Sequence, residues 1–190
     1  MFVVLVFVLF YIKTIGVIKI WDFENKVEKK TLKGHVDCIM CLCKYNEDYL
    51  ASGSADCTIK IWEWKLESQN ALIKSIRGHD TWVKCLTSLN GYLLSGSDDR
   101  TIKVWDSNFD CIKTLKGHKH SIRGLHPISD KRFASASFDG NIKIWDISNF
   151  SLVQTLTGHK SNAINVILLK DGKLASCSND KCIILWEQSN

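Results

Sequence analysis

The chain has 190 residues, a formal net charge of +5 and a hydrophobic content of 45%, which is ordinary for a globular protein that buries a normal core. Its lysines recur along the sequence instead of forming a run, so the charge alone is weak evidence for a nucleic-acid partner, and none is expected. Pro127 is the only proline, which suits a chain of paired strands because proline cannot donate to a ladder.

Residues 1–15 differ from the rest of the chain. They contain the run FVVLVFVLFYI at 2–12, which is shorter than the roughly 20 apolar residues that a membrane span needs. Lys13 ends the run, and neither a basic leading region nor a small-residue cleavage site is visible. The favoured interpretation is a truncated or misread strand of a preceding repeat. A membrane anchor or signal segment is the alternative, although a membrane partner is not expected.

From residue 16 onward the sequence repeats itself. Tryptophans recur at intervals of 41, 43, 40 and 41 residues, at Trp21, Trp62, Trp105, Trp145 and Trp186. Gly-His pairs keep step with them at 34–35, 78–79, 117–118 and 158–159. A period of about 40–45 residues is typical of a repeat architecture. We therefore treat 16–190 as one domain of four full repeats and a partial first repeat, each ending near its tryptophan.

Each full repeat predicts four short strands and no helix. In the repeat that begins at His79, alternating or β-branched runs cover 81–89, 92–97, 101–105 and 111–118, with turn residues between them. The same pattern places outer strands at 26–33 and 71–77. The expected fold class is all-β. A four-stranded unit that is apolar on both faces needs a neighbour on each side, which favours sheets packed radially.

The Gly-His and Trp-Asp or Trp-Glu markers, repeated in register, resemble those of WD40-repeat proteins over roughly residues 16–187. The resemblance implies a β-propeller of four-stranded antiparallel blades. Rings of this kind usually have about seven blades. We therefore expect the 4 to 5 blades of this chain to form a partial propeller. If four blades formed a closed ring, residues 26–33 would have to be the outer strand of the last blade. The sequence GVIKIWD at 16–22 argues against this, because it is an additional third strand with no complete blade around it. Open ends would lead to self-association.

Every full repeat also carries a histidine, a serine, an aspartate and a tryptophan at fixed spacing. A catalytic Ser-His-Asp triad is needed once, whereas four copies indicate a structural device. The resemblance implies a hydrogen-bonded tetrad in each blade, built on the first serine of each Ser-x-Ser pair. The four expected tetrads are His35, Ser52, Asp56 and Trp62; His79, Ser95, Asp99 and Trp105; His118, Ser135, Asp139 and Trp145; and His159, Ser176, Asp180 and Trp186. The partial repeat cannot form one, because Ile15, Tyr11 and Lys13 replace the aspartate and the serines.

Positions that vary between repeats are the candidates for function. The resemblance implies that three positions per repeat point to the narrow top face, where propellers of this family commonly bind peptides. The candidate partner-binding residues there are Met40, Trp82, Lys84, Asp98, Arg123, Phe138 and Asn179. Aromatic and arginine side chains are frequent interaction hot spots. They predict a groove with two cations, Lys84 and Arg123, suited to an extended peptide that is acidic or phosphorylated. Trp64 lies outside the repeat register, as an exposed anchor or as packing for its loop.

The eight cysteines lie mainly in apolar, strand-like patterns, which favours free thiols in a reducing, intracellular compartment. Cys38, Cys41 and Cys43 form a C-x2-C-x-C cluster, but no second C-x2-C accompanies it, so no metal is expected. No cofactor and no catalytic residue are expected either. The leading functional hypothesis is a non-catalytic scaffold for protein or peptide partners. The alternatives are a substrate-recognition segment of a larger enzyme assembly, such as a ubiquitin-ligase receptor or a kinase-linked propeller, and a nonfunctional gene fragment.

Overall fold

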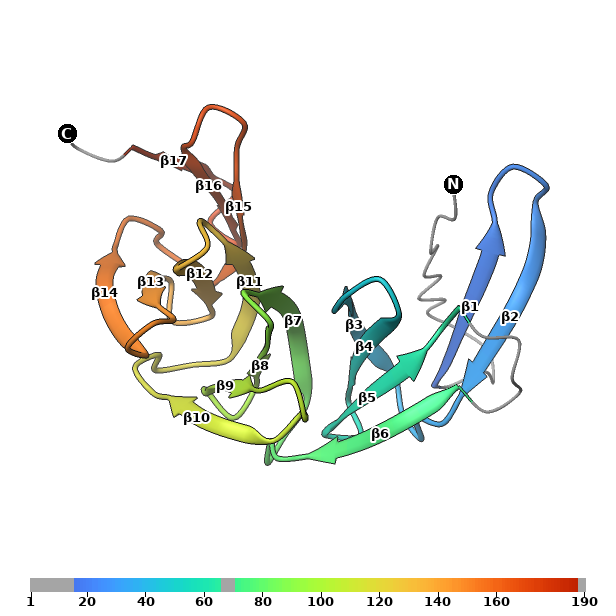
Figure 1. Cartoon of the computed structure of the whole chain (residues 1–190). Helices are drawn as coiled ribbons and strands as arrows, with labels where there is room; N and C mark the ends of the chain where they lie inside the picture. The colour runs from blue at the N-terminus through green and yellow to red at the C-terminus, as the bar shows by residue number, and fades with distance from the viewer. Residues whose placement is uncertain (1–15, 66–70, 188–190) are drawn as a thin grey trace.

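The computed structural model describes residues 16–65 and 71–187, and these residues form five antiparallel sheets around an open arc (Figure 1). None of the described residues lies in a helix, so none of them belongs to a helix able to cross a bilayer. The all-β partial propeller predicted from the repeats is confirmed. We number its sheets as blades 1 to 5 in chain order.

Blades 2, 3 and 4 each have four strands, and blades 1 and 5 have two and three in the described part of the chain. Blade 1 contains β1 (Val17–Asp22) and β2 (Val27–Lys33). Blade 2 contains β3 (Ile39–Lys44), β4 (Tyr49–Ser54), β5 (Thr58–Glu63) and β6 (Leu72–Arg77). Blade 3 contains β7 (Val83–Leu89), β8 (Tyr92–Ser97), β9 (Ile102–Trp105) and β10 (Cys111–Leu115). Blade 4 contains β11 (Ile122–Pro127), β12 (Arg132–Ser137), β13 (Ile142–Asp146) and β14 (Ser151–Leu156). Blade 5 contains β15 (Ala163–Leu168), β16 (Leu174–Ser178) and β17 (Ile183–Trp186).

The strands of each blade are ordered from the inside of the arc to the outside. The first strands of neighbouring blades contact one another, β3 with β7, β7 with β11 and β11 with β15. Figure 1 shows β6, β10 and β14 on the outer side of the arc. The chain therefore runs outward through one blade and returns to the centre to begin the next.

The arc does not close among the described residues. β2 pairs with β1, with Val17 opposite Lys33 and Asp22 opposite Val27, so 26–33 is not the outer strand of blade 5. The sequence GVIKIWD is consequently the third strand of an incomplete blade that retains its own outer strand. Figure 1 shows blades 1 and 5 at opposite ends of the arc. The candidate strand segment at 1–15 lies outside the described residues.

The side chains of each third strand point alternately to its two faces, and those on each face join the apolar core shared with the neighbouring blade. In β5, Ile59 and Ile61 face blade 3, where they join Val83 and Leu93 in one apolar cluster. Trp62 points to the other face and packs against Ile20 of blade 1. Fully burying a side chain of this size contributes about 1.5–3 kcal/mol relative to leaving it exposed. Each blade is therefore stabilised mainly by its neighbours.

The glycine of each Gly-His pair is explained by the tryptophan of the same repeat. A Cβ atom at Gly78 would lie 2.5 Å from Cη2 of Trp105, and one at Gly117 would lie 3.1 Å from Cη2 of Trp145. A side chain in this position would therefore push against a buried ring. The glycine lets the chain pass over the indole and places the following histidine beside it.

Candidate functional site

The four predicted tetrads are complete hydrogen-bonded networks. In each, the histidine Nε2 lies 2.7 Å from the Oγ of the first serine of the Ser-x-Ser pair. The tryptophan Nε1 donates to that same Oγ at 2.8 Å in all four. The histidine Nδ1 lies 2.7, 2.6, 2.8 and 3.0 Å from the aspartate Oδ2 in blades 2 to 5. One device thus ties the second and third strands to the incoming loop of every full repeat.

The second serine of each pair serves the turn. Ser54 Oγ donates to the carbonyl oxygen of Cys38 at 2.9 Å and accepts from the amide of Asp56 at 3.1 Å. The aspartate side chain then caps the turn, because Asp56 Oδ1 accepts from the amide of Thr58 at 2.9 Å. The two serines of one repeat therefore have separate tasks, one in the tetrad and one in the turn.

The protonation state of the blade 2 tetrad follows from its surroundings. Burial lowers the pKa of His35, which favours a neutral imidazole. Burial opposes ionisation of Asp56, but hydrogen bonds from Thr58 and His35 outweigh it and lower the pKa of this carboxyl to about 2. A neutral ring with its proton on Nδ1 donates to Asp56 and accepts from Ser52, while Trp62 donates to Ser52. Every polar group in the network is then satisfied.

This geometry favours a structural role over nucleophilic chemistry. The first serines of blades 2, 3 and 4 are 0% exposed, and Ser176 of blade 5 is 2% exposed. Each serine oxygen already contacts two partners, the indole and the imidazole. A substrate would need to reach a fully enclosed oxygen in a tightly packed network, so the tetrads offer no nucleophile at a surface.

The tryptophan of the partial repeat lacks the serine that accepts a hydrogen bond from the indole in each full repeat. Trp21 of β1 has its Nε1 buried, and no described residue accepts a hydrogen bond from it. The replacements at Tyr11, Lys13 and Ile15 lie outside the described residues. The Nε1 of Trp64 is also buried, and it has no hydrogen-bond partner among residues 16–65 and 71–187. The Trp64 ring packs against the cluster between blades 1 and 2.

Five of the predicted top-face residues come together across blades 3 and 4. Lys84 Nζ lies 4.1 Å from the centre of the Trp82 ring and 3.5 Å from Asp98 Oδ2. The Arg123 guanidinium lies 4.6 Å from the Phe138 ring centre, and its Nη1 lies 4.0 Å from Asp98 Oδ1. Ser121 also donates to Asp98 Oδ1. We call Trp82, Lys84, Asp98, Arg123 and Phe138 the top-face cluster.

The two cations of this cluster differ in access. The Lys84 side chain is 5% exposed, enclosed by the Trp82 ring and Asp98, whereas the Arg123 side chain is 27% exposed. Burial lowers the pKa of Lys84, partly offset by the charge of Asp98. The sequence pattern led us to expect two cations in this groove, and of the two the Arg123 side chain is the more accessible to solvent. A pattern along single strands could not show that Asp98 lies between the two cations.

The remaining top-face candidates belong to blades 2 and 5. Met40 is half-buried on β3, and Asn179 is exposed in the turn between β16 and β17. The sequence reasoning missed Asp80, which joins Cys57, Thr81, Trp82 and Asp98 around a hollow of about 390 Å³. Asp80 directly follows the Gly-His pair of its repeat, and that position was the available signal.

All eight cysteines are free thiols. Burial raises the pKa of Cys85 to about 12, and Cys41 is raised in the same direction for the same reason. The residues of the C-x2-C-x-C cluster belong to the strand β3 and the turn before it. In the described part of the chain, no three His, Cys, Asp or Glu side chains are arranged to hold a metal ion.

The chain is similar to known proteins over most of its length. Residues 26–63, 70–106, 109–146 and 150–187 match the WD40 family, described as WD domain, G-beta repeat. The chain is 43% identical over 127 residues to the nuclear distribution protein nudF of Emericella nidulans, which covers 62% of this chain and 28% of that protein. It is 37% identical over 151 residues to the nuclear distribution protein PAC1 of Arthroderma otae, which covers 69% of this chain and 31% of that protein.

A solved structure shares the fold. The crystal structure of the computationally designed Ika4 protein superposes with a TM-score of 0.71 and 30% sequence identity, covering 82% of this chain and 94% of that one. The chain spans less than a third of the length of the two curated relatives. The four family matches coincide with the four repeats that carry the tetrads, and together they span well over half of the sequence. The chain therefore belongs to the WD40 family of G-beta repeat proteins.

Proposed function

We propose that this chain is a non-catalytic scaffold whose top-face cluster binds an extended peptide of a protein partner. The observation that carries the proposal is the cluster itself, in which two aromatic rings, two cations and one carboxylate from neighbouring blades contact one another. Trp82 is 47% exposed, an unusual position for so large an apolar side chain. Partly exposed tryptophan and arginine side chains held by their neighbours are typical interaction hot spots.

The charges of the cluster determine which peptide it suits. Asp98 offsets one of the two cations, so the cluster as a whole carries about one positive charge. An acidic or phosphorylated group of the peptide would contact Arg123, since Lys84 is enclosed. An apolar residue of the peptide would lie in the hollow beside Trp82, whose carboxylates Asp80 and Asp98 disfavour a second acidic group there. We expect one acidic side chain next to an apolar one, not an acidic run.

Membership in the WD40 family and the free thiols support this role in a reducing, intracellular compartment. The nudF and PAC1 relatives are named for nuclear distribution, and what this chain shares with them is a stretch of repeats. Such a stretch supports a protein-interaction scaffold and leaves the partner to be identified. Self-association through the open ends of the arc is a second part of the proposal, since the outward face of blade 5 is apolar.

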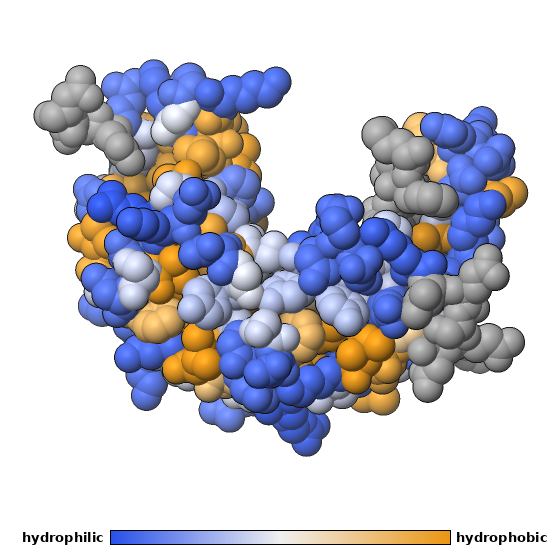
Figure 2. Space-filling model, in the orientation of Figure 1, coloured by the Kyte–Doolittle hydropathy of each residue, from blue (hydrophilic) through white to orange (hydrophobic). Residues whose placement is uncertain are grey.

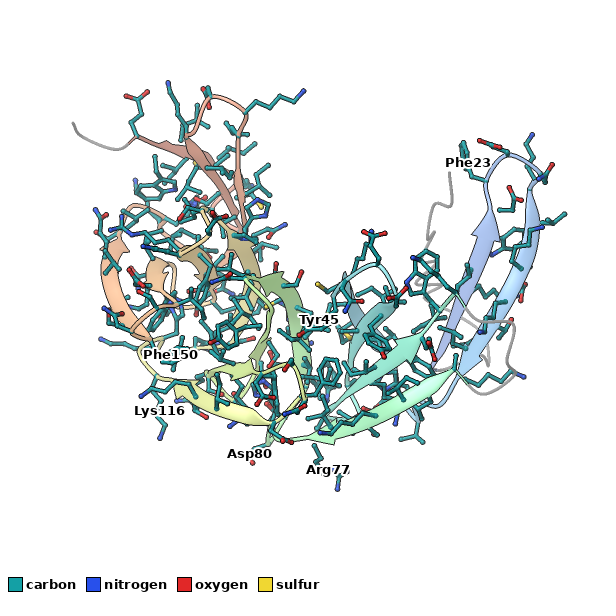
Figure 3. The ribbon with its side chains drawn as sticks, viewed as in Figure 1. Phe23, Tyr45, Arg77, Asp80, Lys116 and Phe150 are labelled. Atoms are coloured by element: carbon teal, nitrogen blue, oxygen red, sulfur yellow. The ribbon has the colours of Figure 1, made fainter. Side chains whose placement is uncertain are left out.

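The test uses the full chain and an array of immobilised peptides, each with one phosphoserine or glutamate beside an aromatic residue. Peptides that bind the wild type are measured again with Arg123→Ala and Phe138→Ala. Each variant should bind at least about fivefold more weakly, as expected for a hot spot worth more than 1 kcal/mol. Arg77→Ala is the matched control, because Arg77 is an exposed arginine on the outer strand β6 (Figure 3). Equal affinity for the wild type and both cluster variants would refute the proposal.

A further inference from the structure

A second hollow, of about 520 Å³, lies on blade 3 beside the strands β9 and β10. All of its lining residues are polar or charged: Asp80, Asp99, Arg100, Thr101, Lys103, Thr114, Lys116 and His118. Figure 3 shows Asp80 and Lys116 on the outer side of the arc, near β10. We call this space the blade 3 hollow. A lining without an aliphatic side chain favours a charged group of a ligand over an apolar one.

Three cationic side chains reach the blade 3 hollow from different places in the blade. Arg100 belongs to the turn between β8 and β9, Lys103 lies on β9, and Lys116 follows β10. Arg100 and Lys116 are exposed, and Lys103 is half-buried. Among residues 16–65 and 71–187, none of the three forms an ion pair with a carboxylate. Cations that converge on a hollow without such partners attract an anion.

The two carboxylates of the hollow differ in what they do. The oxygens of Asp99 are already used, because they contact His79 Nδ1 at 2.6 Å and accept from the Asp80 amide at 3.2 Å. They also accept from the amide and the hydroxyl of Thr101 at 2.9 and 2.6 Å. Asp80 is exposed, and its carboxylate is the group that opposes an anion. Three positive and two negative charges leave the hollow with a formal charge of +1.

The donors in the hollow suit a phosphate group better than a carboxylate. Lys103 Nζ donates to Thr114 Oγ1 at 3.0 Å, which leaves two ammonium protons and the threonine hydroxyl proton available. The Arg100 guanidinium and the Lys116 ammonium add further donors. A carboxylate has two oxygens, whereas a phosphate monoester has three and carries a charge of about −1.5 to −2. Charge-assisted hydrogen bonds to phosphate are among the strongest that proteins form.

This concentration of cations is particular to blade 3 among the complete blades. Three positions define it: the residue after the tetrad aspartate, the third-strand lysine, and the residue before the next Gly-His pair. Blade 3 has a cation at all three, whereas the corresponding sets are Cys57, Lys60 and Arg77 in blade 2 and Gly140, Lys143 and Thr157 in blade 4. The third-strand lysines of blades 2 and 4 are only 8% exposed. The repeat therefore accounts for one of the three cations and not for the cluster.

We propose that the blade 3 hollow binds the phosphate of a phosphorylated serine or threonine in a partner protein. A peptide is favoured as the carrier because Asp80 also lines the hollow beside Trp82. A chain that places its phosphate in one hollow can therefore place an apolar side chain in the other. The lining offers no aliphatic side chain to insert into a membrane. The site contains no residue of the top-face cluster, so it is a second site beyond the function proposed above.

NMR titration of the full chain, labelled with ¹⁵N, tests the proposal. The probe is a glycine-rich peptide with one phosphoserine and, in different versions, a leucine one to four residues away on either side. The tightest version should shift the amides of Arg100, Thr101 and Lys116 in a saturable manner. The same peptide with glutamate in place of phosphoserine should bind at least about threefold more weakly, and that with serine should cause no saturable shift.

Two variants change the affinity in opposite directions. Arg100→Gln together with Lys116→Gln should weaken binding of the phosphopeptide at least about fivefold. The matched control is Lys113→Gln together with Arg132→Gln, which removes the same charge from exposed residues that do not line the hollow. Asp80→Asn should tighten binding by about twofold, because it removes an opposing but solvent-screened charge. A gain in affinity is not the result of a damaged fold.

Further arms of the titration identify the carrier of the phosphate. Inorganic phosphate should bind more weakly than the phosphopeptide, and phosphatidylcholine vesicles containing phosphatidylinositol 4-phosphate should not compete with it. Phe138→Ala should leave phosphopeptide binding unchanged, which separates this site from the top-face cluster. Absence of saturable shifts, or an equal loss of affinity in the two double variants, would overturn the proposal. So would inorganic phosphate or vesicles that bind through Arg100 and Lys116 as tightly as the peptide.

Discussion

At the scale of single residues, the tetrad is a means of burying a tryptophan without leaving its indole N–H unsatisfied. Each of four indoles donates to the serine of its own blade, which also contacts a histidine, and an aspartate contacts the other nitrogen of that histidine. Trp21 lacks this network among the described residues, and its buried N–H is unpaired. The cost of an unpaired buried donor is about 1–3 kcal/mol, comparable to the effect of many core substitutions.

The variant Asp99→Ala should therefore destabilise the fold by about 1–3 kcal/mol, because it leaves His79 Nδ1 and the amides of Asp80 and Thr101 without their acceptor. Urea denaturation measures the loss. Asp130→Ala, a substitution of an exposed aspartate in the β11–β12 turn, is the control and should change stability little. A midpoint for Asp99→Ala equal to that of the wild type would contradict a stabilising role for the tetrad.

The blade 2 tetrad also predicts how stability depends on pH. The pKa of His35 is lower in the folded protein than its ordinary value of 6.5, and the pKa of Asp56 falls from 3.8 to about 2. Both groups bind fewer protons in the folded chain than in the unfolded chain, so their stabilisation is lost as the pH falls. The contribution of His35 declines below about pH 6.5, and that of Asp56 declines between pH 3.8 and about 2.

Urea midpoints measured at pH 7, 5 and 3 test this dependence. The wild type should lose stability at each step, and the loss between pH 7 and 5 should be smaller in His35→Gln, which cannot gain the proton. An identical loss in the two proteins over that interval would show that His35 does not contribute.

At the scale of elements, the strands could be predicted from the sequence because a period of two and turn residues are local signals. The outer strand expected at 71–77 is observed as β6 (Leu72–Arg77), and that expected at 26–33 as β2. Contacts between blades could not be predicted in the same way. Asp98 meets Arg123 of the next blade, and a hollow beside Trp186 is shared by blades 4 and 5. Both depend on residues about 25 or more positions apart.

The Gly-His turns give a prediction at this scale. Gly78→Ala should destabilise the fold by about 1–3 kcal/mol, because its Cβ would lie 2.5 Å from a buried Trp105 ring. Gly34→Ala should cost less, since the nearest ring atom of Trp62 is 3.0 Å away. Thermal unfolding of the two variants ranks them. The opposite order would show that the ring of Trp105 can move aside.

At the scale of the whole molecule, blade 5, the last described blade of the arc, leaves apolar side chains of one face exposed. Ile183 and Leu185 of β17 are 73% and 56% exposed, whereas the equivalent residues of β9, Ile102 and Val104, are both 0% exposed. Ile167 of β15 is 44% exposed. Figure 2 shows hydrophobic surface at the end of the arc that blade 5 forms. In every other blade this face packs on the next blade, and a face of this kind promotes association.

The double substitution Ile183→Lys and Leu185→Lys tests whether this face drives self-association. We expect the wild type to form concentration-dependent assemblies in sedimentation velocity experiments, and the double variant to remain monomeric, because two charges on the face oppose its burial against another copy. In the tetrad of blade 5, the side chains of Ser176 and Trp186 point to the opposite face of the sheet from residues 183 and 185. The variant should therefore keep a similar thermal midpoint. Ile73→Lys together with Ile112→Lys is the matched control, since these exposed isoleucines lie on outer strands and not on an open blade face. Association that persists in the blade 5 variant, or that disappears only in the control, would show that the copies meet elsewhere.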